Sequence, residues 1–140
     1  MKHLLCFLCA AVLHTVAIAQ CDKNFRITSS KTEYVDSLGT VQRTQDEKST
    51  IEITGQDIKI VHGENDDTMT GKIKTVECSW KIPYKQGKFI IRTSLQDQSG
   101  DTKPASITLE GKDGKLTITL VADEMPNKRI RLNMDSFEER

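Results

Sequence analysis

The chain has 140 residues, a length typical of a single domain. Its 20 Lys and Arg residues balance its 20 Asp and Glu residues, so the chain lacks the basic surplus that nucleic-acid binders normally carry. Hydrophobic residues make up 36% and charged residues 29% of the chain, which favours a globular domain with a polar surface over a disordered or membrane-spanning chain.

Residues 1–19 have the three-part pattern of a secretory signal peptide. A weakly positive start precedes an uninterrupted apolar run, residues 4–13, which is shorter than the ~20 residues that cross a bilayer. Ala17 and Ala19 place small residues where a signal peptidase reads them. We therefore expect cleavage after Ala19 and a secreted or periplasmic mature chain, residues 20–140. The alternative is an uncleaved leader that serves as an interfacial anchor.

Cys21 gives the end of the leader a second interpretation. Residues 18–21 resemble the lipobox of bacterial lipoproteins, in which the cysteine becomes the lipidated N-terminus. Gln20 departs from that pattern, because a small residue is expected directly before the cysteine. We therefore favour cleavage after Ala19 and keep a lipid anchor on Cys21 as the alternative.

The mature chain keeps two of the four cysteines, Cys21 and Cys78. Two cysteines in an exported protein predict a disulfide. It would close a loop of ~58 residues and stabilise the fold by about 4 kcal/mol, by limiting the freedom of the unfolded chain. The alternative is a buried free Cys78 with an untethered or lipidated Cys21.

Beyond Cys21, apolar and polar residues alternate, which is typical of strands that bury one face. In chain order, strands are predicted around residues 25–28, 34–35, 41, 51–54, 58–61, 73–82, 89–95, 105–110, 115–122 and 129–134. Turn-rich sequences separate them at 36–39, 55–57, 63–67, 96–101, 113–114 and 126–128. The segment 136–140 is predicted to be a tail or one helical turn.

The predicted strand around Trp80 is the longest. Four of its residues share one face: Val76, Cys78, Trp80 and Ile82. Ile73 is out of phase with them, which predicts a β-bulge near Thr75 or a strand that changes its buried face. Pro83 then ends regular pairing.

About eight to ten strands joined by short loops, with no helix, must run antiparallel, because parallel strands need crossovers of a dozen residues or more. A meander with one apolar face has to hide that face, either in a barrel or between two packed sheets. The predicted fold is therefore an all-β, antiparallel up-and-down meander that forms a barrel, a half-barrel or a sandwich.

The order of the hairpin at 36–39, the pair 51–53 and 58–60, the Trp80 strand and the Asp113-Gly114 hairpin resembles the small exported lipocalin-like proteins of bacteria. The resemblance spans about residues 24 to 135. It implies a lipocalin-like barrel or half-barrel for residues 20–140, and some such proteins hold a small apolar ligand in the barrel mouth. The Gly-x-Trp of typical lipocalins has no counterpart in the first strand, so no ligand-binding residue is carried over.

Residues with catalytic or metal-binding chemistry are sparse. His62 is the only histidine of the mature chain, and its place at the end of an alternating run favours a structural role over that of a catalytic base. No Gly-x-Ser-x-Gly elbow or phosphate-binding loop occurs, and one histidine with two distant cysteines gives no zinc spacing. The acidic loops 64–67 and 97–101 carry oxygen ligands that calcium accepts, but such residues are common in turns. We predict no enzyme, no metal and no cofactor.

A small basic group follows the turn at 126–128. Lys128, Arg129 and Arg131 are interpreted as a solvated strand face that pairs with Asp123 and Glu124. The alternative is an anion site.

Two functions fit this fold. In the first, the barrel interior holds a small, largely apolar ligand, and the candidate lining residues are Trp80, Phe89, Ile91, Ile118 and Leu120. In the second, the interior is filled, and the protein is a non-catalytic structural or interaction module that meets a protein partner in the envelope or the extracellular space. An interior cavity above roughly 300 Å³ favours the first. A packed interior with an exposed apolar patch favours the second. Neither function involves nucleic acid or a transmembrane span.

Overall fold

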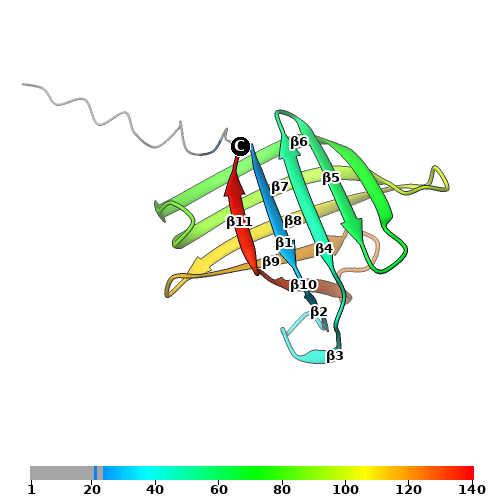
Figure 1. The fold of residues 1–140 in the computed structure, drawn as a ribbon, viewed down its shortest axis with the longest axis horizontal. Helices are drawn as coiled ribbons and strands as arrows, with labels where there is room; N and C mark the ends of the chain where they lie inside the picture. The colour runs from blue at the N-terminus through cyan, green and yellow to red at the C-terminus, as the bar shows by residue number, and fades with distance from the viewer. Residues whose placement is uncertain (1–20, 22–23) are drawn as a thin grey trace, which may run out of the picture.

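The fold of the computed structural model is antiparallel and all-β, as predicted (Figure 1). The structure describes residue 21 and residues 24–140; the leader and its cleavage position lie outside the described residues. The strands are β1 (Phe25–Ser29), β2 (Lys31–Val35), β3 (Val41–Gln45), β4 (Ser49–Thr54), β5 (Asp57–His62), β6 (Asp67–Ile82), β7 (Gln86–Gln96), β8 (Thr102–Lys112), β9 (Lys115–Ala122), β10 (Arg129–Asn133) and β11 (Ser136–Glu139).

All eleven strands belong to one sheet, in the order β11-β1-β4-β5-β6-β7-β8-β9-β10-β2-β3. From β4 to β10 each strand pairs with the next one along the chain, which confirms the up-and-down meander. The ladder of hydrogen bonds does not close into a barrel, and β11 and β3 are its two edges. The half-barrel alternative therefore describes the sheet better than a closed barrel.

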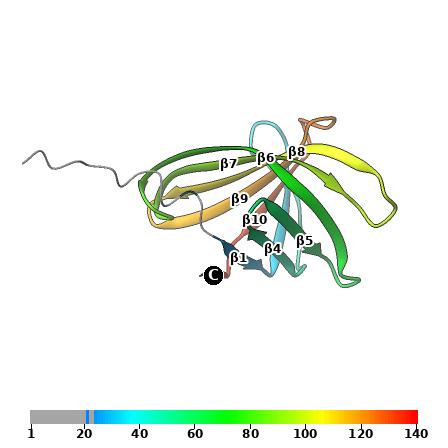
Figure 2. The ribbon, with the colours of Figure 1, turned by 90° about the horizontal axis from the view of Figure 1, so that it is seen from above.

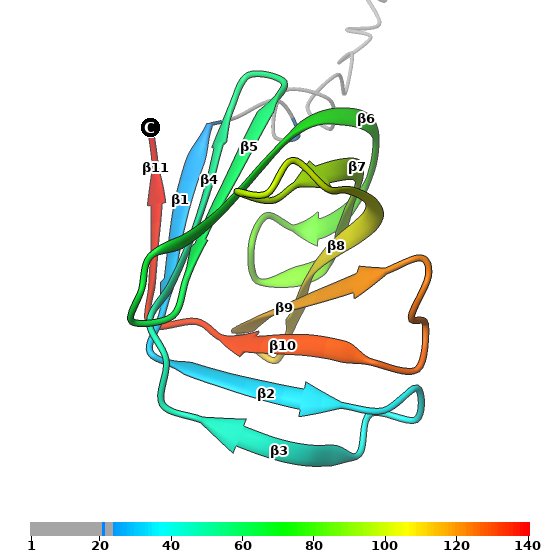
Figure 3. The same ribbon diagram turned by 90° about the vertical axis from the view of Figure 1, so that its right-hand side faces the viewer.

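Three bends make the sheet curl. Only Ser30 separates β1 from β2, residues 46–48 separate β3 from β4, and residues 134–135 separate β10 from β11. Strands β11, β1 and β4 form one end of the sheet, and strands β10, β2 and β3 form the other. Each strand at one end continues through a bend into a strand at the other end, β1 into β2, β3 into β4 and β10 into β11. The sheet therefore wraps round on itself (Figure 3), and the bends raise the strand number to eleven.

The curled sheet buries its inner face between two layers. Figure 2 shows β6, β7, β8 and β9 crossing over the layer that contains β1, β4 and β5. The core cluster consists of Phe25, Ile27, Ile51, Ile53, Ile58, Ile60, Phe89, Ile91, Leu95, Ala105, Ile107, Leu109, Ile118 and Leu132. Phe25 meets Phe89 across the layers in an edge-on contact, with ring centroids 6.1 Å apart. Each fully buried Phe, Ile or Leu side chain contributes roughly 1.5–3 kcal/mol through the hydrophobic effect.

The turn sequences act as predicted. Asp113 and Gly114 both have positive φ, 53° and 76°, the conformation of a two-residue type I′ hairpin. The β2–β3 turn is held by Asp36, whose carboxylate accepts hydrogen bonds from the amides of Leu38 and Thr40, each at 2.9 Å.

The predicted irregularity in β6 is confirmed as a register shift between Ile73 and Thr75. Two side chains of its predicted apolar face are nevertheless exposed, Val76 at 42% and Ile82 at 50%. The reason is the length of β6, because β5 pairs with it only from Asp67 to Lys72. Beyond Lys72, the described residues place no strand on that side of β6.

The interpretation of residues 136–140 as a tail or helical turn was wrong. Ser136–Glu139 is strand β11, which pairs antiparallel with β1. Phe137 anchors it, with its ring centroid 5.5 Å from that of Phe25 and 4.5 Å from that of Tyr84. Four residues are too short to display a period of two, so only the contact with β1 reveals the strand.

Two buried threonines should respond oppositely to loss of their hydroxyl groups. Thr32 is fully buried, and its Oγ1 has no hydrogen-bond partner among the described residues, whereas the hydroxyl of Thr93 donates to the Lys72 carbonyl at 2.8 Å. We expect Thr32→Val to raise the free energy of unfolding by about 1 kcal/mol, and Thr93→Val to lower it by about 1 kcal/mol or more. Urea unfolding of both variants measures the difference; equal losses in both would contradict it.

Candidate ligand-binding site

Three of the five candidate lining residues lie in the packed core. Ile91 and Ile118 are completely buried, and Phe89 is 4% exposed. Their side chains belong to one apolar cluster that fills the space between the two layers. These residues hold the layers together, and they do not line the pocket that contains Leu120.

Trp80 belongs to an aromatic group at the turn of the β6–β7 hairpin. Its ring centroid lies 5.5 Å from that of Tyr84, which contacts Phe137. Burial, with a smaller contribution from the carboxylate of Glu139, raises the pKa of Tyr84 above its ordinary value. Trp80 is only partly buried, yet its indole Nε1 is enclosed, and no residue in the described part of the chain is its hydrogen-bond partner. Trp80 therefore packs with the aromatic side chains at this hairpin and does not line the pocket near Leu120.

Leu120 occupies a different position, at the open end of the curled sheet. The strand register places it beside Ile107 of β8 and Ile130 of β10. Ile130 is in turn paired with Tyr34 of β2. Directly paired residues point to the same face of a sheet. Because Ile107 is completely buried, this row leads from the core outward to the open end.

A pocket of about 550 Å³ lies at the end of this row, which we call the mouth pocket. It sits where the β2–β3 turn and the β9–β10 turn come to the same side of the sheet (Figure 3). Its lining consists of Tyr34, Val35, Gln42, Arg43, Leu120, Ala122, Met125, Asn127, Lys128, Arg129 and Ile130. Its volume is within the range of small-molecule sites, ~300–1,000 Å³.

The mouth pocket combines an apolar wall with basic groups. Leu120 and Ile130 extend the apolar surface of the core, and Met125 is 41% exposed at the rim. Arg43 lies over the ring of Tyr34, with its guanidinium carbon 4.1 Å from the ring centroid. This cation–π contact keeps the Arg43 side chain beside the pocket.

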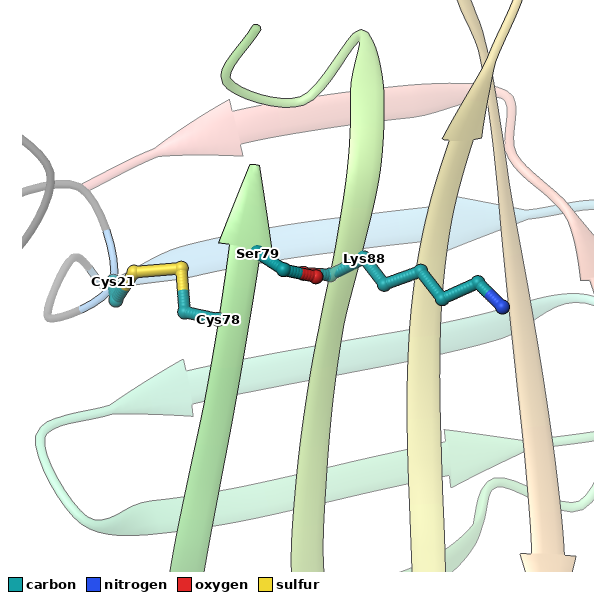
Figure 4. Close-up of a disulfide and its surroundings, with 4 residues drawn as sticks. All are labelled: Cys21, Cys78, Ser79 and Lys88. Carbon is teal, nitrogen blue, oxygen red and sulfur yellow. A yellow bond between two sulfur atoms is a disulfide. The ribbon is translucent and has the colours of Figure 1, made fainter. Parts of the chain in front are cut away.

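The two mature cysteines form the predicted disulfide (Figure 4). The Cα atoms of Cys21 and Cys78 are 6.1 Å apart, within the range for such bonds. The bond fixes the start of the described chain to the exposed half of β6. A structural disulfide is compatible with an oxidising, extracellular compartment.

His62 lies at the end of β5, as its sequence pattern predicts. Its Nδ1 is 3.3 Å from the hydroxyl of Ser49 and 3.7 Å from a carboxylate oxygen of Glu47. A hydrolytic triad needs the nucleophile and the acid on opposite ring nitrogens. Here both groups approach the same nitrogen, so the arrangement supports a structural histidine.

The described residues were compared with what a metal site and a membrane-spanning helix require. Among these residues no group of three or more His, Cys, Asp or Glu side chains is placed to hold a metal ion. Within the same part of the chain, no helix has the length and apolar character needed to cross a bilayer.

Comparison of the chain with protein-family models, with curated proteins and with solved structures finds no match. The lipocalin-like resemblance therefore stays a prediction.

Sequence reasoning identified Leu120 but missed the rest of the mouth pocket. Ile130 carried a signal, since it alternates in phase with the buried Leu132. Tyr34 and Arg43 carried none, because their place beside Leu120 depends on the pairing of β2 with β10. The predicted basic group is divided: Lys128 and Arg129 line the pocket, whereas Arg131 pairs with Glu33.

Proposed function

We propose that the protein is an exported binding protein that holds a small, largely apolar molecule in the mouth pocket. The observation that carries the proposal is the apolar row that runs from buried Ile107 through Leu120 and Ile130 into a pocket of about 550 Å³. The packed core restricts the ligand to this open end, so the ligand lies at the mouth and not in the centre of the sheet.

Export is supported by the leader sequence and by the disulfide. A lipid anchor would occupy the Sγ atom of Cys21, which is the atom bonded to Cys78. Lipidation and the disulfide are therefore mutually exclusive on one molecule. The disulfide favours the cleaved, unlipidated form that begins at Gln20, and the intact mass of protein purified from its source distinguishes the two forms.

A non-catalytic interaction module is the second candidate, favoured by the filled core. Val76 and Ile82 are exposed along the part of β6 that extends beyond β5. This strip presents apolar side chains beside a strand edge that pairs with no other described strand, and such an edge is a common place for another protein to add a strand.

We expect Leu120→Gln to weaken binding of the neutral fluorescent probe N-phenyl-1-naphthylamine by about tenfold. The substitution keeps the size of the side chain but places a polar amide on the apolar wall, and a loss of ~1.4 kcal/mol corresponds to a factor of ten. Fluorescence titration of the mature protein measures the dissociation constant.

The matched control is Ile82→Gln, which makes a similar change on a half-exposed side chain outside the mouth pocket. It should leave the affinity unchanged. Wild-type protein that does not bind the probe, or a Leu120→Gln variant that binds as tightly as wild type, would overturn the proposal. A loss of affinity in both variants would place the probe elsewhere, with the same consequence.

A further inference from the structure

The charged side chains that line the mouth pocket are basic. Three of its lining residues are cationic, Arg43 of β3, Lys128 of the β9–β10 turn and Arg129 of β10. Among the residues that the structure describes, none that lines the pocket is acidic. Two chain segments far apart in the sequence thus bring positive charge to one apolar opening.

These cations are not neutralised by carboxylates of the described residues. Two arginines elsewhere in the sheet have acidic partners, Arg26 with Glu52 and Arg131 with Glu33. Arg43, Lys128 and Arg129 form no ion pair among the described residues, so the pairing of Lys128 and Arg129 with Asp123 and Glu124 predicted from the sequence is not formed.

The contacts of the two arginines leave their charge available. Arg43 lies over the Tyr34 ring, and the Nε of Arg129 donates to the Pro126 carbonyl at 3.4 Å. Both contacts orient the guanidinium group without cancelling its charge. An oriented guanidinium offers two parallel N–H donors that match the two oxygens of a carboxylate.

From this combination we infer that the ligand of the mouth pocket is an amphipathic anion, with a single apolar chain and a carboxylate headgroup. The inference rests on the proposed function and adds the chemical class of the ligand. The apolar chain lies against Leu120 and Ile130, and the headgroup lies at the rim among Arg43, Lys128 and Arg129. A neutral molecule of the same length uses the apolar wall alone.

The test compares decanoate with decanol, which share a ten-carbon chain and differ in headgroup charge. We expect the mature protein to bind decanoate about tenfold more tightly than decanol in isothermal titration calorimetry at pH 8 and low salt. Exposed ion pairs each contribute up to ~1 kcal/mol, so two or three of them supply this factor. The preference should shrink in 0.5 M salt, since screening weakens exposed pairs.

The triple variant Arg43→Gln, Lys128→Gln, Arg129→Gln should still bind decanol, but it should bind decanoate no better than decanol. The matched control is Lys74→Gln, Arg92→Gln, Lys103→Gln, which removes the same charge from exposed positions outside the pocket. This control should keep the preference for decanoate.

The outcomes separate this inference from the proposed function. If wild-type protein binds decanoate and decanol equally, or if the control variant loses the preference as the pocket variant does, the inference is overturned while an apolar site stands. If neither molecule binds, both the inference and the proposed function fail. Binding to vesicles of phosphatidylglycerol without any binding of monomeric decanoate would assign the cations to a membrane surface, and would overturn the inference.

Discussion

Replacing both cysteines, Cys21→Ser with Cys78→Ser, is expected to lower the free energy of unfolding by about 4 kcal/mol and the melting temperature by roughly 15 °C. The disulfide joins residues 57 positions apart, so its removal frees a long loop in the unfolded chain. It also releases the start of the chain from β6, where β5 gives no support beyond Lys72. Thermal and urea unfolding followed by circular dichroism measure both quantities.

Ser79→Ala is a suitable control, because Ser79 adjoins Cys78 and its hydroxyl donates only an exposed hydrogen bond of 3.4 Å to the Lys88 carbonyl (Figure 4). Its stability should stay within about 0.5 kcal/mol of wild type. Wild-type protein treated with a reductant should behave as the double variant does. Two reactive thiols in untreated, denatured mature protein, or a double variant as stable as wild type, would show that the disulfide does not contribute.

Gly87→Ala should lower the free energy of unfolding by roughly 2–5 kcal/mol, from backbone strain and overpacking together. Gly87 has a φ of +126°, a backbone conformation that residues with a side chain rarely adopt. It lies between Trp80 of β6 and Gly111 of β8. An added Cβ would overlap the carbonyl oxygen of Ser79 and approach the Cα of Trp80 to 2.7 Å, so the β6–β7 hairpin has to open.

Urea unfolding measures the loss of stability, and the emission of Trp80 should shift because its backbone is displaced. Gly100→Ala provides the comparison, since Gly100 also has positive φ but open space around the new Cβ. The free energy of unfolding of the Gly100→Ala variant should fall only by the cost of backbone strain, roughly 1–2 kcal/mol. Equal losses in the two variants would mean that the close approach of β6 and β7 at Gly87 does not matter.

Much of the fold was predictable because strand formation and tight turns are local. Ile51 and Ile53 alternate with polar residues, as strands with one buried face require. The Asp113-Gly114 pair supplies the positive φ angles that a two-residue hairpin needs. Short loops then dictate antiparallel neighbours.

The mouth pocket was only partly predictable, since its residues come from segments about 80 positions apart or more. Leu120 could be identified from alternation, but Tyr34 and Arg43 face it only because β2 pairs with β10. The exposure of Val76 depends similarly on where β5 ends. Neither the pairing of β2 with β10 nor the point where β5 ends can be recognised from the residues that neighbour these positions in the sequence.

The sequence by itself determined the all-β class, the turns, the antiparallel order of the central strands and the pair of cysteines available for a disulfide. Only the tertiary structure decided that β1 and β2, β3 and β4, and β10 and β11 are bent halves of three long strands, and that an open sheet curls to form a cationic, apolar mouth. The buried positions show why: they run through odd residues to Ser29 and resume at the even Thr32, so the strand turns its other face inward at the bend. Alternation reports which side chains avoid water, whereas the direction in which a sheet bends depends on the distant strands that pack against it.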